Sequence, residues 1–295
     1  MTTSLEPDAA PPEPPPVDPA GVAAHAAVAD AGRKFRRNRR KFIERQDAES
    51  LHSLRVSLRR LRAVLTLFRP VVVMPRRLSD RELRWVGHEL ADLRDQDVAL
   101  DAIRALPEDA EARGQLKELE RRREREAYRV GKRLRGPRIR SMLRALRRWD
   151  ATPDFSVDEH TPVSVILPGL RSRIAAVELH PAWALTLIPD AAGHLHAADA
   201  IYDDQTTADL LHQLRRRIKQ VRYQLEVTGR VLHEDWLPTL ERLRVLQESL
   251  GVMQDVRMLG ALTAVPQDRI EAASAAWEEM RGERLGSARG LLDNR

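Results

Sequence analysis

The sequence contains no cysteine, little glycine and few aromatic residues. Of its 295 residues none is Cys, 14 are Gly, and 4% are Phe, Trp or Tyr. The absence of Cys excludes a disulfide framework, thiolate zinc ligands and thiol catalysis. The scarcity of Gly and aromatic residues argues against a Gly-rich nucleotide-binding chain and against an all-β fold.

Long apolar runs are also missing. No stretch approaches the ~20 apolar residues that a transmembrane helix needs, so we expect no contact with a membrane. The first 20 residues hold seven Pro and four acidic residues, and they lack the basic start and apolar centre of a secretory signal. We therefore expect residues 1–20 to form a disordered Pro-rich tail, and the protein to be cytoplasmic.

Charged residues, in contrast, are abundant and biased towards arginine. They make up 32% of the chain, the formal net charge is +6, and only five of the 50 basic residues are Lys. A composition dominated by Leu, Ala, Arg and Glu is typical of long, solvated helices. The planar guanidinium binds phosphate through two parallel contacts, although a GC-rich genome explains the ratio equally well. The placement of the arginines therefore matters more than their number.

Helical periodicity accounts for most of the chain, and no segment alternates convincingly as a strand. The pattern predicts helices over about 22–42, 48–69, 80–105, 108–135, 137–149, 163–180, 207–229, 237–262 and 267–292. The acidic, Pro-containing segment 150–162 is expected to be a linker. We therefore predict an all-α fold with one helical domain over 21–292, divided into halves at 21–149 and 163–292.

The two halves carry an internal repeat at an offset of 160 residues. His52 aligns with His212 and, 43 residues further on in both copies, Asp95 aligns with Asp255. Ten of the 47 positions in this gap-free alignment are identical. Because each copy alone would leave an apolar face uncovered, we expect two helical bundles related by a pseudo-twofold axis.

The repeated helix presents a basic stripe on one face. At about 100° per residue, one His and three cations of each copy fall within an arc of about 80°, opposite an apolar face. The two stripes consist of His52, Arg55, Arg59 and Arg62, and of His212, Arg215, Lys219 and Arg222. Like charges at these spacings repel, so the stripes need acids from neighbouring helices or an anionic ligand. The candidate acids are Asp95, Asp97, Asp255 and Glu226.

Each stripe begins with a histidine, for which two roles are open. A neutral imidazole caps or fills a half-buried position. Close to a bound polyanion its pKa would rise, and the ring would add positive charge to the site. Neither role is catalytic.

These residues resemble the signatures of the CHAD family, the conserved-histidine α-helical domain. Residues 52–62 match the first signature, His-x-x-Arg-Val-x-x-Arg-Arg-Leu-Arg, and residues 83–98 resemble the segment that follows it. Residues 212–226 and 250–255 resemble the signature of the second half and its continuation. The resemblance covers about 22–292, which is nearly everything except the tail.

The resemblance implies two helical bundles with a basic surface that binds inorganic polyphosphate. The phosphate-binding positions that it implies are His52, Arg55, Arg59, Arg62, His212, Arg215, Lys219 and Arg222, with Arg60, Arg84 and Arg244 as second-rank candidates. We expect Asp95, Asp255 and Glu226 to pair with arginines and hold helices in place. One departure from the pattern is Gln220, which stands where the first copy has Arg60, so the stripes are not equally basic.

Some members of this family consist of the domain alone and are associated with polyphosphate granules. Others are fused to a triphosphate-tunnel domain that carries out hydrolysis. The Glu-x-Glu-x-Lys motif of that tunnel domain is absent from this sequence. The resemblance therefore implies a stand-alone binding module, found on polyphosphate granules, that needs no catalysis, cofactor or metal.

Three other functions stay open at this point. An enzyme could place a metal on His88 and Asp92, four residues apart, but no third ligand and no nucleotide-binding or hydrolase motif accompanies them. A non-specific nucleic-acid binder fits the basic composition but lacks clustered aromatic residues for base stacking. A granule-coat scaffold would use its mixed-charge helices near 118–129 and 272–284. We expect polyphosphate as the partner, with weak competition by nucleic acid.

Overall fold

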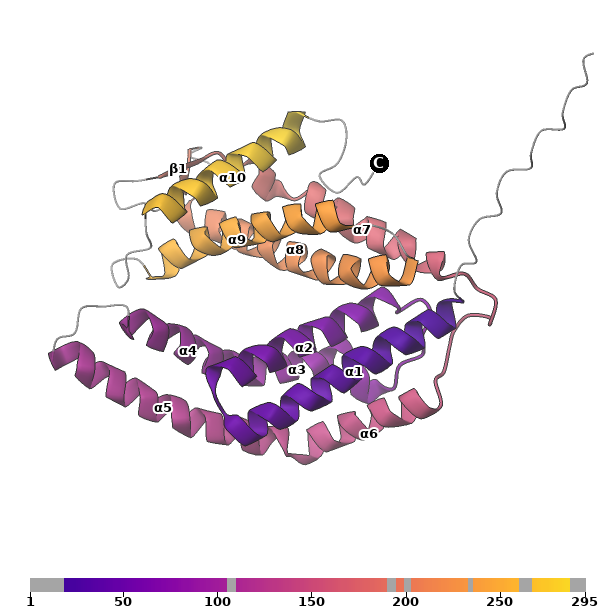
Figure 1. Ribbon diagram of the computed structural model, residues 1–295. Helices are drawn as coiled ribbons and strands as arrows, with labels where there is room; N and C mark the ends of the chain where they lie inside the picture. Colours follow the sequence, from indigo (N-terminus) through magenta and orange to yellow (C-terminus); the bar gives the residue numbers. More distant parts are fainter. Residues whose placement is uncertain are drawn as a thin grey trace, which may run out of the picture.

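The helices form two stacked units in the computed structural model (Figure 1). The structure describes residues 19–104, 110–189, 195–198, 203–232, 236–259 and 267–286. All but the last two residues of the predicted tail, 1–20, therefore lie outside the described residues. The N-terminal unit consists of α1 (Ala20–Arg45), α2 (Ala48–Leu67), α3 (Asp80–Glu89), α4 (Ala91–Arg104), α5 (Ala110–Leu134) and α6 (Pro137–Ala151). The C-terminal unit consists of α7 (Leu167–Glu178), α8 (Asp204–Leu232), α9 (Leu237–Leu259) and α10 (Gln267–Gly286).

The predicted all-helical class is confirmed, and a short hairpin is a first difference from the prediction. Strands β1 (Leu187–Pro189) and β2 (Leu195–Ala197) pair in antiparallel fashion, and Leu187 lies opposite Ala197. The hairpin follows the short 3₁₀ helix η3 (Pro181–Ala184). Proline interrupts the helical hydrogen bonding in this segment, so the backbone groups find partners across a strand pair instead.

A second difference concerns the helix predicted over 80–105, which is divided into α3 and α4. The division falls at Leu90, whose φ of −99° and ψ of −6° end α3. The carbonyl of Leu90 accepts a hydrogen bond from Arg55 Nη1 at 3.0 Å. An arginine of α2 therefore satisfies a carbonyl at the point where the helix breaks.

The hairpin of α1 and α2 positions the first basic stripe. Gln46 ends α1 in the left-handed conformation with a φ of 55°. Asp47 then caps α2 by accepting a hydrogen bond from the backbone N–H of Ser50 at 2.7 Å. Hydrogen bonding with Ser50 lowers the pKa of Asp47, so the carboxylate of the cap is charged at neutral pH.

One continuous hydrophobic core contains residues of both units. Leu54 and Leu61 of α2 and Leu214, Ile218 and Leu225 of α8 are each fully buried, with 0% exposure. These are the apolar faces that helical periodicity predicts on the two repeated helices. Helices α2 and α8 also contact each other, which brings the two basic stripes to one region of the molecule.

The segment 152–162, which connects the two units, is fixed along the N-terminal unit. The backbone N–H of Val73 donates to the carbonyl of Asp154 at 2.9 Å, and that of Ser156 donates to the carbonyl of Val71 at 2.9 Å. At the far end, the N–H of Ala20 donates to the carbonyl of Thr161 at 2.7 Å. The start of α1 is therefore tied to the entrance of the C-terminal unit.

A buried ion pair joins α4 to α5. Arg123 Nε donates to Asp97 Oδ1 at 2.8 Å, and the side chains are only 13% and 2% exposed. Arg123 Nη1 also donates to the carbonyl of Gln46 at the end of α1. The pair therefore links three helices through a single guanidinium.

Arg123→Ala is expected to lower the free energy of unfolding by about 3 kcal/mol, because it leaves the carboxylate of Asp97 buried and unpaired. Urea denaturation at pH 7 measures the change. The control is Arg121→Ala, which removes an exposed charge from the same helix. Equal effects of the two substitutions would show that the pair does not stabilise the fold.

Candidate functional site

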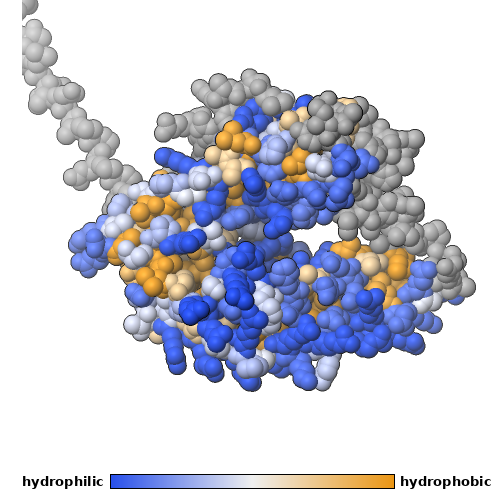
Figure 2. Space-filling model, turned by 180° about the vertical axis from the view of Figure 1, so that it is seen from behind, coloured by the Kyte–Doolittle hydropathy of each residue, from blue (hydrophilic) through white to orange (hydrophobic). Residues whose placement is uncertain are grey.

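A cationic groove of about 1430 Å³ opens between α2, α3 and α8. Seen from behind, the molecule is hollowed between the two units, and hydrophilic side chains gather in the hollow (Figure 2). The lining contains one carboxylate, that of Asp80, and eight cationic side chains. The cations are Arg59, Arg62, Arg69, Arg81, Arg84, Arg216, Arg217 and Lys219. Such an imbalance creates a strongly positive potential inside a concave surface.

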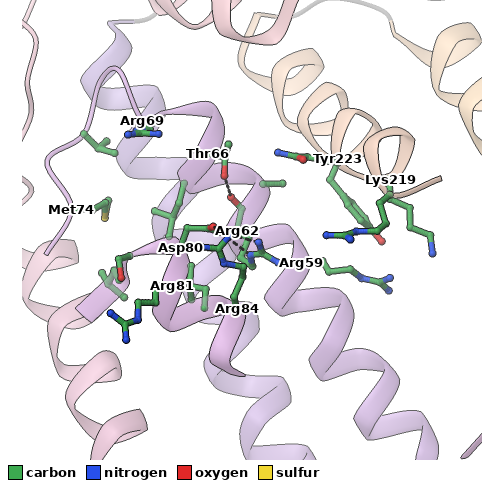
Figure 3. A pocket seen from close by; sticks show the side chains of 18 of the residues that line it. Arg59, Arg62, Thr66, Arg69, Met74, Asp80, Arg81, Arg84, Lys219 and Tyr223 are labelled. Atoms are coloured by element: carbon green, nitrogen blue, oxygen red, sulfur yellow. Dashed lines mark hydrogen bonds and ion pairs between the residues drawn. The ribbon is translucent and has the colours of Figure 1, made fainter. Parts of the chain in front are cut away.

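Helix α2 supplies the largest share of this lining. Arg59, Arg62 and Thr66 follow one another along the helix, Arg69 lies in the turn after it, and all four line the same groove (Figure 3). Thr66 Oγ1 donates to the carbonyl of Arg62 at 2.8 Å, so its hydroxyl turns back onto the helix. The basic surface predicted over residues 52–62 therefore continues to Arg69, in the turn that follows α2.

Asp80 organises the α3 side of the groove. Its Oδ1 accepts hydrogen bonds from Arg62 Nε at 3.1 Å and from Arg62 Nη2 at 2.9 Å. Its Oδ2 lies 3.3 Å from Arg84 Nη1. One carboxylate therefore holds two guanidinium groups in place, and the groove keeps a large excess of positive charge.

Lys219 enters the groove from α8, opposite the arginines of α2 (Figure 3). The pKa of Lys219 is lowered to about 7, mainly by burial and then by the charges of Arg215, Arg59, Arg55 and Arg222 in that order. Two of these arginines belong to α2 and two to α8. The basic stripes of the two halves thus meet around a single lysine.

Tyr223 lies next to two of the clustered cations. The guanidinium of Arg59 lies 5.8 Å from the centre of its ring, and that of Arg222 lies 4.9 Å from it. The ring is only 7% exposed. An electron-rich ring close to both guanidinium groups offsets part of their repulsion.

The start of the first stripe is also cationic. Burial, and then the charges of Arg59 and Arg94, lower the pKa of Arg55. Burial lowers the pKa of His52 as well, followed by the charges of the same two residues and of Arg55. The imidazole of His52 is therefore neutral at pH 7 in the free protein.

The second stripe begins with His212, which is exposed on α8. Arg215 Nη1 donates to Gln254 Oε1 at 2.9 Å, and its guanidinium lies against Gly251 of α9. A Cβ atom at position 251 would stand 2.9 Å from Arg215 Nη2. The glycine therefore leaves room for the arginine that faces Lys219.

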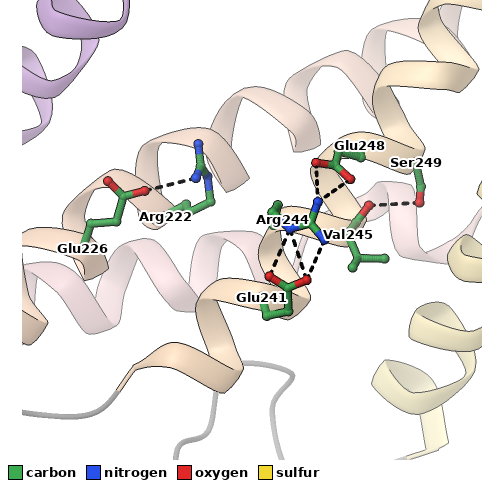
Figure 4. A network of polar contacts seen from close by, with 7 residues as sticks. All are labelled: Arg222, Glu226, Glu241, Arg244, Val245, Glu248 and Ser249. Carbon is green, nitrogen blue, oxygen red and sulfur yellow. Dashed lines mark hydrogen bonds and ion pairs between the residues drawn. The ribbon is translucent and has the colours of Figure 1, made fainter.

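The expected partner acids behave in three different ways. Glu226 accepts from Arg222 at 3.0 Å and lies 3.6 Å from Arg60, so it connects α8 with α2 (Figure 4 draws the first contact). Asp95 forms no ion pair with the described residues and acts on Arg55 only through its charge. The buried acid that pairs with an arginine is Asp97 instead. The side chain of Asp255 lies outside the described residues.

Arg244 differs from the other candidate positions because its charge is already compensated. Glu241 and Glu248 accept hydrogen bonds from its guanidinium at 2.6 Å and 2.7 Å (Figure 4). These contacts raise the pKa of Arg244. The residue is exposed on α9 and does not line the groove.

Four groove cations were not among the sequence-predicted residues. Arg69 could have been found, because the 100° periodicity places it on the same face of the helix predicted over 48–69 as Arg62. Arg216 and Arg217 lie outside the arc of the stripe on α8, and Arg81 lies on α3, which carries no stripe. Only the packing of α3 and α8 against α2 brings them to the groove.

The alternative metal pair is divided by the break at Leu90. His88 belongs to α3 and Asp92 to α4, so they do not lie on one continuous helix. Within the described ranges, no group of three or more His, Asp or Glu side chains is placed to hold a metal ion. Among the helices that the structure describes, none has the length and apolarity needed to cross a membrane.

The arrangement is that of an all-helical protein with a cationic groove where two helical units meet. The chain belongs to the CHAD domain family, whose model matches residues 26–264. The family resemblance inferred from the two His/Arg signatures is thereby confirmed. No match to a curated protein is found by sequence.

Two solved structures share the fold. The CHAD domain from the plant Ricinus communis has a TM-score of 0.62 and 21% identity, and the match covers 93% of this chain and 90% of that chain. PptA from Streptomyces chartreusis has a TM-score of 0.52 and 19% identity, with coverage of 91% and 96%. At these identities the likeness concerns the fold alone.

Proposed function

We propose that this protein binds inorganic polyphosphate in the groove between α2, α3 and α8. The observation that carries the proposal is the charge of the lining, eight cationic side chains against one carboxylate. Arginine side chains on rigid helices suit the repeated phosphate groups of such a chain. Binding would relieve the mutual repulsion of these cations.

We assign direct phosphate contacts first to the stripe residues that line the groove, Arg59, Arg62 and Lys219, together with Arg84. Arg55 and Arg215 act beside them, since their charges reach Lys219. In this proposal the two halves of the chain are copies related by a pseudo-twofold axis. The duplication joins two basic stripes into one surface that is longer than either stripe.

The lining favours polyphosphate over nucleic acid. Tyr223 is the one aromatic residue among the groove residues that the structure describes, and two arginines flank its buried ring. Bases therefore find no open platform for stacking. Asp80 is held by two arginines, which leaves it unsuited to act as a general base. We accordingly propose a binding module without catalysis of its own, located on polyphosphate granules.

Isothermal titration of the full chain with long-chain polyphosphate tests this function. Single-stranded DNA at equal phosphate concentration and free orthophosphate serve as comparison ligands. We expect polyphosphate to bind at least about tenfold more tightly than the DNA, because stacking cannot contribute. Equal affinity for the two polymers would contradict the proposal and favour a non-specific polyanion binder.

Polyphosphate affinity is expected to fall as the pH rises from about 7 to 9. Lys219 has a pKa of about 7 in the free protein, below its ordinary value of 10.5. A bound polyanion raises the pKa of Lys219, so binding is coupled to the uptake of a proton between pH 7 and 9. The affinity therefore falls by at most about tenfold for each pH unit. Fluorescence anisotropy across the range measures the fall. In the variant Lys219→Arg the side chain stays charged over this range, so most of the fall in affinity should disappear. A pH profile equal to that of the wild type would contradict the assignment of Lys219 as the titrating group.

A further inference from the structure

A second set of unbalanced cations lies on the exposed side of α6. We call Arg140, Arg144, Arg147 and Arg148 the α6 face. At about 100° per residue these four positions share an arc of about 100°, without an acidic residue on it. All four side chains are exposed, and none forms a hydrogen bond or an ion pair with the described residues.

Two further arginines extend the α6 face towards α1. Arg39 Nε donates to the carbonyl of Leu134 at 2.9 Å, and Arg135 Nη2 donates to the carbonyl of Ile43 at 3.2 Å. Burial lowers the pKa of Arg39, and the charges of Arg135 and Arg147 lower it further. Cations from α1, from the turn after α5 and from α6 therefore converge. Backbone carbonyls rather than carboxylates hold two of them in place.

Outside the groove, the arginine-rich surface of α5 carries acids that pair with its arginines. On α5, Arg125 lies 3.3 Å from Glu118 and Arg129 lies 3.0 Å from Glu126. An arginine-biased composition by itself therefore produces mixed, paired surfaces here. The α6 face is different because its like charges stand at helical neighbour positions, where they repel.

The α6 face and the groove are separate surfaces. Helix α6 lies on the side of the N-terminal unit that faces away from α8, with α1 and α2 between them (Figure 1). The groove residues come from α2, α3 and α8 and from the segments next to α3 and α6, and none belongs to the α6 face. One molecule therefore exposes two cationic surfaces that do not compete for the same stretch of ligand.

We propose that the α6 face, with Arg39 and Arg135, is a second polyanion site that binds another segment of inorganic polyphosphate. The identity of this ligand rests on the proposed function. The cations from Arg140 to Arg147 extend over about 10 Å of helix, an array that suits a linear chain of charges. The arc carries no aromatic or amide side chain with which to read a base. With both sites filled, a single protein molecule bridges two polyphosphate segments.

A capture assay tests the bridging. Beads that carry immobilised polyphosphate are loaded with the full-length protein, and a second, fluorescent polyphosphate is added. Four proteins are compared, and light scattering checks that each is in the same oligomeric state. They are the wild type, an α6 variant (R140Q/R144Q/R147Q), a stripe variant (R55A/R59A/R215A/K219A) and a matched control on α5 (R121Q/R125Q/R129Q).

The wild type and the α5 control should capture the second chain. The α6 variant should keep its affinity for the beads within about threefold and lose capture by about fivefold or more, because only one site is left. Its melting temperature should stay unchanged, since the three side chains are exposed. Capture equal to that of the wild type would overturn the α6 face as a site, and so would capture of duplex DNA without capture of polyphosphate.

The stripe variant separates this proposal from the proposed function. If the groove binds polyphosphate, this variant loses most of its affinity for the beads. If instead it binds as the wild type does while the α6 variant does not bind, the groove assignment fails and the α6 face stands as the principal site.

Discussion

Polyphosphate binding is expected to weaken at least about a hundredfold in the stripe variant, in which Arg55, Arg59, Arg215 and Lys219 are all Ala. A hydrogen bond to a charged group contributes about 1.5–3 kcal/mol, so the loss of the two direct contacts, those of Arg59 and Lys219, accounts for a change of this size. The fold should persist, because the removal of cations that repel one another around Lys219 offsets the lost hydrogen bond from Arg55 to the carbonyl of Leu90. Fluorescence anisotropy with labelled polyphosphate gives the affinity, and circular dichroism checks the helix content.

The control for this prediction removes four cations from an exposed surface. The variant R121A/R122A/R125A/R129A on α5 changes the net charge by the same amount, and it leaves the groove intact. It should bind polyphosphate within about threefold of the wild type, since only the general field is reduced. A loss as large as that of the stripe variant would mean that net charge, and not the groove, determines binding.

Lys219→Met is expected to make the free protein more stable and polyphosphate binding weaker. In the folded protein Lys219 is repelled by four arginines, which lowers the free energy of unfolding. An apolar side chain of similar size removes this repulsion and should raise the free energy of unfolding by about 1–2 kcal/mol. The change should also weaken binding about tenfold, because a charged contact is lost. Opposite effects on stability and affinity are the mark of a residue retained for function.

The gain in stability should depend on pH. Lys219 has a pKa of about 7 when folded and an ordinary value of 10.5. Between these values the unfolded chain binds the proton and the folded chain does not, so the stability of the wild type rises with pH. The advantage of the Met variant is therefore largest at or below pH 7 and shrinks towards pH 10. Urea denaturation at pH 6 and pH 9 measures it.

The matched control for this variant is Lys117→Met, which replaces an exposed lysine on α5. It should change neither the free energy of unfolding nor the affinity. If Lys219→Met lowers the free energy of unfolding at pH 6, the lysine is not a repelled cation, and its position in the groove has another cause.

Much of the fold follows from sequence periodicity. Leu54 and Leu61 on α2, and Leu214 and Ile218 on α8, repeat at helical spacing, and the structure buries all four. The proline pattern likewise separates the helices. The division at Leu90 could not be foreseen, because it depends on a hydrogen bond from Arg55, which is 35 residues distant in the sequence.

The candidate site was predictable in part for the same reason. Residues on one helix, such as Arg59 and Arg62, are brought together by periodicity alone. Ion-pair partners could not be predicted, because the choice of Asp97 over Asp95 depends on which face of α4 packs against Arg123. Arg81 and Arg216 reach the groove only through the packing of α3 and α8 against α2, which a single sequence does not specify.

The salt dependence of polyphosphate binding tests the central claim most directly. For the wild type, the logarithm of the association constant should fall linearly and steeply with the logarithm of the salt concentration. The slope of the stripe variant should be smaller by at least about two, one for each of Arg59 and Lys219, the two removed cations that line the groove and are assigned to phosphate contact. Equal slopes for the two proteins would contradict the account, because the stripes would then not touch the ligand.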